Sequence, residues 1–245
     1  MALVICMAGL NTRFHDAGFD IPKYLLPWED NTIITEILKK LTENYEFDEI
    51  ILLANKRDSY FKKDLIKAIE PLGLSENNIH YIGDTSGQAH TALIGAGLQT
   101  NKLNPLVIHN ADTIVTNRDF KGIFQTFHNI SDAWVDVFVA NSPAYSYVES
   151  KDGVVTNIVE KRPISPYASS GLYCFVDALT YEEQFYEAKE KIQDRELYVS
   201  DILKNMVEEN KVVLTNELKS DHETIVLGSP QEYGIELAKK KIGIR

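Results

Sequence analysis

Cysteine is scarce in this sequence of 245 residues, which contains only Cys6 and Cys174. Each lies in a short apolar run typical of a buried strand, and their spacing gives no support to a disulfide or a metal pair. Core positions in a reducing compartment are favoured instead. The sequence also lacks an internal repeat, a low-complexity segment and a linker rich in Pro, Gly or Ser. We therefore expect residues 1–245 to form a single domain, without an appended hexapeptide-repeat domain.

Positive charge is scarce as well, because 25 Lys and Arg residues face 36 Asp and Glu residues, for a formal net charge of −11. No basic run offsets this excess, which argues against nucleic acid or an anionic membrane as a partner. The apolar start at residues 2–8 is too short to cross a bilayer, and no signal-peptide pattern is present. We expect a cytoplasmic protein. An acidic protein can still bind phosphates, but only through a few local cations and backbone amides.

The first half of the chain alternates short apolar runs with helical patterns. The alternation predicts an α/β fold with a mostly parallel, Rossmann-like sheet flanked by helices. Such sheets bind ligands at the carboxyl ends of their strands. The expected strands are 2–8, 49–54, 79–82 and 106–109, and the expected helices are 32–41, 57–72 and 88–98.

The second half is less regular, and we expect it to form a smaller antiparallel lobe over one edge of the main sheet. In the helix at 88–98, Gly95 and Gly97 each cost about 1 kcal/mol relative to alanine, and close packing of the helix on the sheet is the favoured explanation. The expected strands are 134–140, 148–160, 169–175 and 211–215, and the expected helices are 177–191, 197–209 and 230–242.

The loop after the first strand contains the clearest candidates for a phosphate site. A turn of small residues at a strand end lets backbone amides approach a phosphate, and Arg13 and Lys23 add two positive charges. Taken alone, one glycine before a basic residue is a weak signal, and an ordinary solvated loop is favoured. The segment reads Met7-Ala8-Gly9-Leu10-Asn11-Thr12-Arg13-Phe14, followed by Ile21-Pro22-Lys23-Tyr24-Leu25.

These two stretches resemble the Gly-x-Gly-Thr-Arg and Pro-Lys-x-Leu motifs of the nucleoside-diphosphate-sugar pyrophosphorylases. The resemblance extends from about Ala2 to Tyr233. It implies a GT-A-like nucleotidyltransferase fold, with residues 1–130 binding the nucleotide and residues 131–245 the acceptor. Asn11 stands where the family has its second glycine. Because asparagine tolerates positive φ better than most residues, we expect the turn to be kept.

The resemblance also implies roles for individual residues. Arg13 would hold the triphosphate and stabilise departing pyrophosphate, and Lys23 would contact the α-phosphate and the incoming phosphate. The stretch from Gly87 to Ala92 is similar to the family segment that holds the base, although alone it fits an ordinary helix start equally well. The nucleotide-binding residues implied in this way are Ala8, Gly9, Leu10, Asn11, Thr12, Gly87 and Gln88.

Asp112 is the metal ligand that the resemblance implies, and Mg²⁺ is the cofactor. It follows a buried strand in His109-Asn110-Ala111-Asp112, which resembles the family's metal motif. Out of context, an aspartate here would more often be a turn or cap residue.

The family's second metal-binding acid has no counterpart at the matching position. That position precedes the turn at 228–230 and holds Val226. Glu223 or Asp221 is the nearest substitute, and Asp201 is more distant. A single carboxylate completed by phosphates and water is a further alternative, because Mg²⁺ often keeps several waters.

Three residues of the second half are implied to bind the acceptor: Glu160, Lys161 and Gly171. Glu160 and Lys161 resemble the family's Glu-Lys-Pro motif, in which the glutamate meets sugar hydroxyls and the lysine the phosphate. Alone, they would be a charged strand end. Gly171 resembles the glycine of a family strand on which the acceptor lies, and an isolated strand glycine can equally mark a bulge.

Together these residues predict a nucleotidyltransferase that joins a nucleoside monophosphate to a phosphorylated small molecule, with a sugar 1-phosphate as the favoured acceptor, and releases pyrophosphate. Arg13-Phe14 followed by Ala17-Gly18-Phe19 is similar to a branch of the family found in capsule and surface-glycan synthesis. The alternatives are a cytidylyltransferase for phosphocholine or another non-sugar phosphate, a nucleotide-sugar-dependent glycosyltransferase, and a non-catalytic nucleotide binder. The sequence leaves the base, the acceptor and a homo-oligomeric state open.

Overall fold

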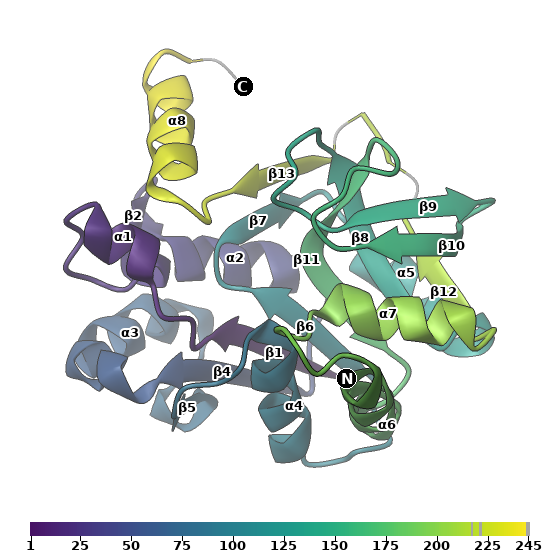
Figure 1. Ribbon diagram of the computed structural model, residues 1–245. Coiled ribbons are helices and arrows are strands. Elements are labelled where there is room, and N and C mark those ends of the chain that lie inside the picture. The colour runs from purple at the N-terminus through teal and green to yellow at the C-terminus, as the bar shows by residue number, and fades with distance from the viewer. Residues whose placement is uncertain (217, 221, 244–245) are drawn as a thin grey trace.

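A computed structural model describes residues 1–216, 218–220 and 222–243. Its main sheet has nine strands, which are β1 (Ala2–Met7), β4 (Glu49–Asn55), β5 (Ile79–Ile82), β6 (Leu106–Asn110), β8 (Ala133–Val139), β9 (Tyr147–Lys151), β10 (Val154–Val159), β11 (Tyr167–Phe175) and β12 (Val213–Thr215). They are ordered β5-β4-β1-β6-β11-β8-β12-β10-β9 (Figure 1).

The first four strands of this order are parallel, and β11 runs antiparallel to both β6 and β8. The α/β fold with a mostly parallel sheet is thereby confirmed. The antiparallel strands of the second half continue the same sheet. Two short two-stranded sheets lie beside it, one formed by β2 (Pro27–Trp28) with β3 (Asn31–Thr32) and one by β7 (Thr113–Thr116) with β13 (Glu223–Val226).

Helices cover both faces of the main sheet. The α-helices are α1 (Thr12–Asp16), α2 (Ile33–Thr42), α3 (Lys62–Ile69), α4 (Gln88–Leu98), α5 (Phe120–Ile130), α6 (Ala178–Lys191), α7 (Val199–Glu208) and α8 (Pro230–Lys241). The 3₁₀ helices are η1 (Lys23–Leu25), η2 (Lys56–Phe61), η3 (Glu70–Leu72) and η4 (Glu76–Asn78), so the helix expected at 57–72 is divided into three. In the described part of the chain, no helix is long and apolar enough to span a membrane.

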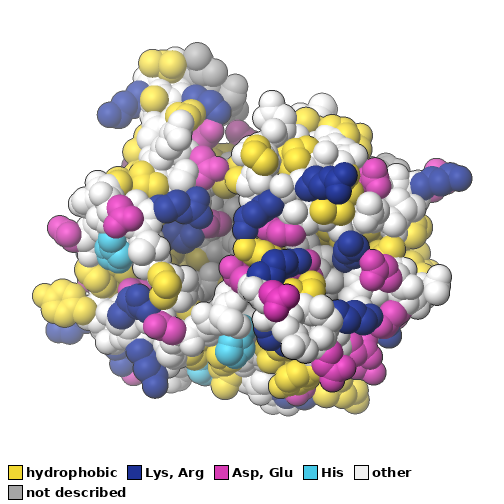
Figure 2. All heavy atoms as spheres, in the orientation of Figure 1, with side chains coloured by type: hydrophobic (Ala, Val, Ile, Leu, Met, Phe, Trp, Pro, Cys, Tyr) yellow, Lys and Arg dark blue, Asp and Glu magenta, His cyan; other side chains and the backbone are white. Residues whose placement is uncertain are grey.

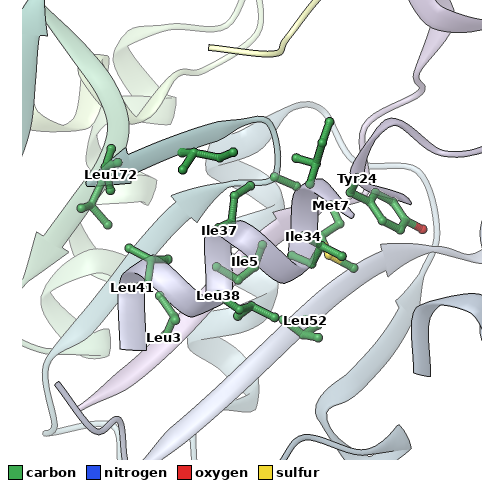
Figure 3. Packing of buried hydrophobic residues seen from close by; sticks show 14 of the residues in the cluster. Leu3, Ile5, Met7, Tyr24, Ile34, Ile37, Leu38, Leu41, Leu52 and Leu172 are labelled. Carbon is green, nitrogen blue, oxygen red and sulfur yellow. The ribbon is translucent and has the colours of Figure 1, made fainter. Parts of the chain in front are cut away.

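Side chains of β1 alternate between two hydrophobic cores, one on each face of the sheet. Leu3, Ile5 and Met7 belong to the core under α2, whereas Val4 belongs to the core under α4, α6 and α7. A strand buried on both faces needs a continuous apolar run, which is what the sequence supplies. Figure 3 shows the first of these cores, where the strand residues Leu3, Ile5, Met7 and Leu52 face Ile34, Ile37, Leu38 and Leu41 of α2.

The two glycines inside α4 have different surroundings. A Cβ at Gly95 would overlap the side chain of Val4, so this glycine allows the close approach of helix and sheet that was expected. A Cβ at Gly97 would meet nothing within 4 Å, so close packing does not explain it. The structure gives no reason for the second glycine.

A fully buried ion pair fixes the small β7–β13 sheet to the main sheet. The Arg118 guanidinium donates to both carboxylate oxygens of Asp136 on β8, at 2.7 and 3.1 Å. It also donates to the Thr116 carbonyl and the Thr224 hydroxyl, at 3.0 and 2.9 Å. The pair therefore joins β7, β8 and β13.

Replacing Arg118 with methionine is expected to lower the free energy of unfolding by about 3–5 kcal/mol, because the Asp136 carboxylate would stay buried without its partner. The double variant Arg118→Met/Asp136→Leu should lose less, since it leaves no buried charge. Urea denaturation of both variants measures the difference. A single variant as stable as the wild type would refute the structural role given to the pair.

Candidate active site

A cavity opens where the parallel strands β1 and β6 end, and it is lined by both halves of the chain. Figure 2 shows the molecule hollowed between the α1 side and the α7 side, with Lys and Arg side chains on both sides of the hollow. Residues that the sequence placed in nucleotide, metal and acceptor sites meet in this one cavity. They are Arg13, Gln88, Asp112, Glu160 and Gly171, and Val226 lies among them.

The loop after β1 keeps its turn although asparagine replaces the second glycine. Asn11 has φ 57° and ψ 18°, in the left-handed region, and its amide donates to the Ile21 carbonyl at 3.4 Å. Of residues 8–13, all of which the structure describes, only Arg13 lines the cavity. Ala8 is buried, and Gly9, Leu10 and Thr12 are exposed beside it. The nucleotide-binding roles of these four residues stay predictions.

Lys23 does not line the cavity wall, but its ammonium reaches the metal motif. It begins the 3₁₀ turn η1, whose next two residues are buried. The Tyr24 hydroxyl donates to the buried Asp58 at 3.0 Å, which anchors the turn to η2. Nζ of Lys23 lies 2.5 Å from Oδ2 of Asp112. The two sites that the sequence assigned separately are therefore in direct contact.

Asp112 lies in the tight link between β6 and β7. Burial by itself would raise the pKa of its carboxyl, but the charge of Lys23 and hydrogen bonds from Lys23 and Thr113 outweigh burial and lower the pKa below its ordinary value. The Asp112 carbonyl accepts from Leu227 N–H at 2.7 Å. The carboxylate is therefore ionised and held by Lys23 and Thr113, while the backbone of Asp112 is bonded to the segment that precedes Gly228.

Glu223 does not join Asp112, which corrects one of the predicted metal ligands. On β13, Val226 pairs with Thr113 beside the cavity, whereas Glu223 pairs with Thr116 at the far end of the strand. A separation of three residues spans about 10 Å along a strand and reverses the side-chain direction. Glu223 accordingly lines a different cavity, with Glu36, Glu236 and Lys240 among its neighbours.

The other two candidate acids give no second ligand either. Asp221 lies outside the described residues. Asp201 is held by Arg195, whose guanidinium donates to both carboxylate oxygens at 2.8 Å, and it also accepts from the Tyr198 N–H at the start of α7. In the described ranges, no group of three or more His, Cys, Asp or Glu side chains could hold a metal.

A carboxylate that the sequence did not suggest lies close to Asp112. The position that a Cβ of Gly228 would take is 3.2 Å from Oδ2 of Asp112 and 3.5 Å from Oε2 of Glu232. Glu232 lies in the first turn of α8 and accepts from the Tyr145 hydroxyl at 3.1 Å and the Ser229 hydroxyl at 2.8 Å. Both carboxylates line the cavity, and the missing side chain of Gly228 leaves the space between them open.

The opposite end of the cavity is formed by the start of α4. Gly87 has φ 123°, and a Cβ there would overlap the carboxylate of Glu196, so only glycine fits. Gln88 begins the helix and lines the cavity, and its buried Nε2 has no hydrogen-bond partner. An unpaired buried amide costs free energy unless a ligand satisfies it. Gln88 thus has a donor available to a ligand in the cavity.

Glu160 and Lys161 follow β10 and make different contacts, although Nζ of Lys161 lies 3.7 Å from Oε1 of Glu160. The Glu160 carboxylate accepts from the Ser146 hydroxyl and, at 2.8 Å, from the Ser200 hydroxyl, which fixes it in the cavity. Lys161 has φ 54°, and its ammonium donates to the Tyr198 hydroxyl at 2.5 Å at the rim. This arrangement places a fixed acceptor of hydroxyl protons inside and a cation at the entrance.

Gly171 is required by its own backbone and by a neighbour. Its φ is 85°, in a bulge where the β11–β8 register shifts between Ser169 and Tyr173. A Cβ there would also overlap the Asn110 amide, which lines the same cavity. The motif comparison assigned Asn110 no role of its own, although it stands in the motif that ends at Asp112.

A family model described as nucleotidyl transferase matches residues 2–221. The chain belongs to the nucleotidyl transferase family. Among solved structures, this nucleotidyltransferase is similar to a nucleoside-diphosphate-sugar pyrophosphorylase from Vibrio cholerae RC9, with a TM-score of 0.81 and 25% identity over 96% of this chain and 99% of that one.

Two further solved structures share the fold of this nucleotidyltransferase. A UDP-glucose pyrophosphorylase complexed with UDP-glucose gives a TM-score of 0.73 at 20% identity, covering 100% of this chain and 99% of that one. An inositol-1-phosphate CTP transferase from T. maritima gives 0.72 at 14% identity, covering 100% and 97%. No curated protein matches the chain.

Proposed function

We propose that this nucleotidyltransferase transfers a nucleoside monophosphate from a nucleoside triphosphate to a phosphorylated acceptor, with a sugar 1-phosphate as the favoured acceptor. The observation that supports this most directly is the single cavity in which Arg13, Gln88 and Asp112 meet Glu160 and Gly171. Residues 1–130 would hold the nucleotide and residues 131–245 most of the acceptor. The polar lining suits a hydroxylated phosphate.

The reaction needs positioning and charge neutralisation more than covalent help from the protein. An oxygen of the acceptor phosphate attacks the α-phosphorus, a new P–O bond forms, and the bond to the bridging oxygen of the β-phosphate breaks. Pyrophosphate leaves with that electron pair. Arg13 and Lys23 neutralise the negative charge that develops, and Lys161 at the rim attracts the acceptor phosphate.

Magnesium fits the acidic end of the cavity. Oxygen ligands are what Mg²⁺ prefers, and the Asp112 and Glu232 carboxylates lie on two sides of the space above Gly228. These two residues would hold the ion together with phosphate oxygens and water. When bound, it would neutralise phosphate charge. Lys23, which now pairs with Asp112, would then be free to contact the α-phosphate.

We base the acceptor and the cellular role on the chemistry of the cavity and on the resemblance. The V. cholerae neighbour is described as a nucleoside-diphosphate-sugar pyrophosphorylase, and the T. maritima neighbour takes inositol 1-phosphate. Both names point to a phosphate ester of a polyol. We place the reaction in the cytoplasm, where it would supply an activated sugar for capsule or surface-glycan synthesis.

The two rivals from other classes are less well supported. A glycosyltransferase on this fold would leave Lys23 without a clear task, whereas here its ammonium lies 2.5 Å from the Asp112 carboxylate. A non-catalytic binder was suggested by Val226, but Glu232 brings a second carboxylate to the same cavity. Both facts favour transfer chemistry.

Pyrophosphate release with a panel of nucleoside triphosphates and phosphorylated acceptors tests the proposal. We expect release that requires one triphosphate, one hydroxylated phosphate and Mg²⁺ together, and formation of the matching nucleoside-diphosphate product. Release with phosphocholine alone would select the cytidylyltransferase alternative. Triphosphate binding without turnover across the whole panel would contradict an enzymatic role.

A further inference from the structure

One hydroxyl group in the cavity stands apart from the others. Ser170 of β11 is only 3% exposed, lines the cavity, and has no hydrogen-bond partner for its Oγ. A buried hydroxyl without a partner is unfavourable, and such groups are uncommon in native proteins. An unpaired hydroxyl beside a ligand cavity is explained most simply by a partner on the ligand.

Every other hydroxyl that lines this cavity interacts with the protein. Ser169 Oγ accepts from the Gly171 N–H at 3.1 Å, and the Ser146 hydroxyl donates to Glu160. The Thr113, Tyr145 and Tyr198 hydroxyls are bonded to Asp112, Glu232 and Lys161, and Tyr173 interacts with Ser169. Ser170 is therefore the hydroxyl left available.

The backbone of β11 explains why this side chain faces the cavity. Successive residues of a regular strand point to opposite faces, yet Ser169 and Ser170 both line the cavity. The register shift between Ser169 and Tyr173, together with the positive φ of Gly171, forms a bulge at this point. Bulges near active sites redirect side chains in this way.

We infer that the Ser170 hydroxyl binds a hydroxyl group of the acceptor and so helps to select among acceptors. This inference rests on the proposed function. Glu160, held by Ser146 and Ser200, accepts a second hydroxyl from the same wall of the cavity. A trimethylammonium group can neither donate nor accept a hydrogen bond, so phosphocholine would leave Ser170 unsatisfied.

The test compares the wild type with Ser170→Ala, using the acceptor that the panel selects and its set of monodeoxy analogues. Loss of the Ser170 contact should lower kcat/KM for the parent acceptor by about 5- to 100-fold. For the one analogue that lacks the contacted hydroxyl, the wild type and the variant should have equal kcat/KM. The variant should keep the wild-type KM for the triphosphate and the wild-type unfolding temperature.

Thr116→Val is the matched control. Thr116 also has a buried hydroxyl without a partner, but it lies on β7 and lines a different cavity. Its kinetics should equal those of the wild type. Equal kcat/KM of Ser170→Ala and wild type for every acceptor, or a preference of the wild type for phosphocholine, would overturn the inference. Absence of turnover in the wild type would instead refute the proposed function.

Discussion

Replacing Lys23 or Asp112 with alanine is expected to lower kcat by at least about 100-fold, which is the usual effect of removing a group that stabilises transition-state charge. Lys23 is one of the two cations that we propose for the triphosphate, and Asp112 is the carboxylate in the link after β6. In the free protein their side chains are 2.5 Å apart, and the charge of Lys23 helps to lower the pKa of Asp112. Pyrophosphate release at saturating substrates measures both effects.

The contact predicts that the two substitutions will not be additive. Residues in one ion pair act as a unit, so the kcat of the double variant should be only slightly lower than that of the less active single variant. Lys23→Ala should also raise the pKa of Asp112, since burial then acts without the lysine to offset it. As the pH is lowered, the Asp112 carboxylate of this variant should therefore be protonated earlier than in the wild type. Its affinity for divalent metal should accordingly begin to fall at a higher pH.

A surface lysine provides the control for Lys23. Lys62 forms a similar ion pair with Glu76 at 2.6 Å, but it lies on α3 outside the cavity. Lys62→Ala should keep wild-type turnover and stability, because exposed ion pairs contribute little. Full activity of Lys23→Ala or Asp112→Ala, in a protein that is folded by circular dichroism, would contradict the roles assigned to them.

The parallel half of the fold could be predicted because its signals are local. Strands β1 and β6 are continuous apolar runs, and α4 occupies the residues expected for it, 88–98. The sheet formed by β7 and β13 could not be predicted in this way. Each strand has four residues, and the partners lie more than a hundred positions apart in the chain. Only tertiary contacts specify such a pairing.

One helix was missed although the sequence contains its pattern. In α5, Phe120, Phe124 and Phe127 are spaced to face one side of a helix and are buried in the first core. Asp119 precedes them and caps the helix by accepting from the Gly122 N–H at 2.9 Å. A start signal and an apolar stripe were therefore both present in the sequence.

Site residues could be predicted where a motif places a charged side chain at the end of a strand. They could not be predicted where folding brings a helix that is distant in sequence to the same cavity. Arg13, Lys23 and Asp112 follow strands or precede turns, so their side of the sheet can be inferred. Glu232 lies three residues after Ser229, a spacing that indicates a helix cap. Ser229 does cap α8, because its hydroxyl accepts from the Glu232 N–H at 3.2 Å. Only the packing of α8 beside Gly228 reveals that the Glu232 carboxylate lies near Asp112.

Glu232→Gln is the second substitution for which we expect a large effect. It removes the negative charge and keeps an oxygen that can accept from Tyr145, so α8 should remain in place. The affinity for Mn²⁺ in the presence of the triphosphate should fall by at least about 10-fold. Isothermal titration calorimetry measures this affinity directly, and turnover should recover as the concentration of Mg²⁺ is raised.

Glu223→Gln provides the comparison that decides which acid replaces the missing ligand. It makes the same chemical change on β13, three residues before Val226, in a cavity that does not contain Asp112. We expect its Mn²⁺ affinity and turnover to equal those of the wild type. The opposite result, with Glu223→Gln impaired and Glu232→Gln normal, would mean that β13 rearranges when the metal binds. Equal affinities in both variants would mean that Asp112 is the only protein carboxylate that the ion requires, with phosphates and water supplying its other ligands.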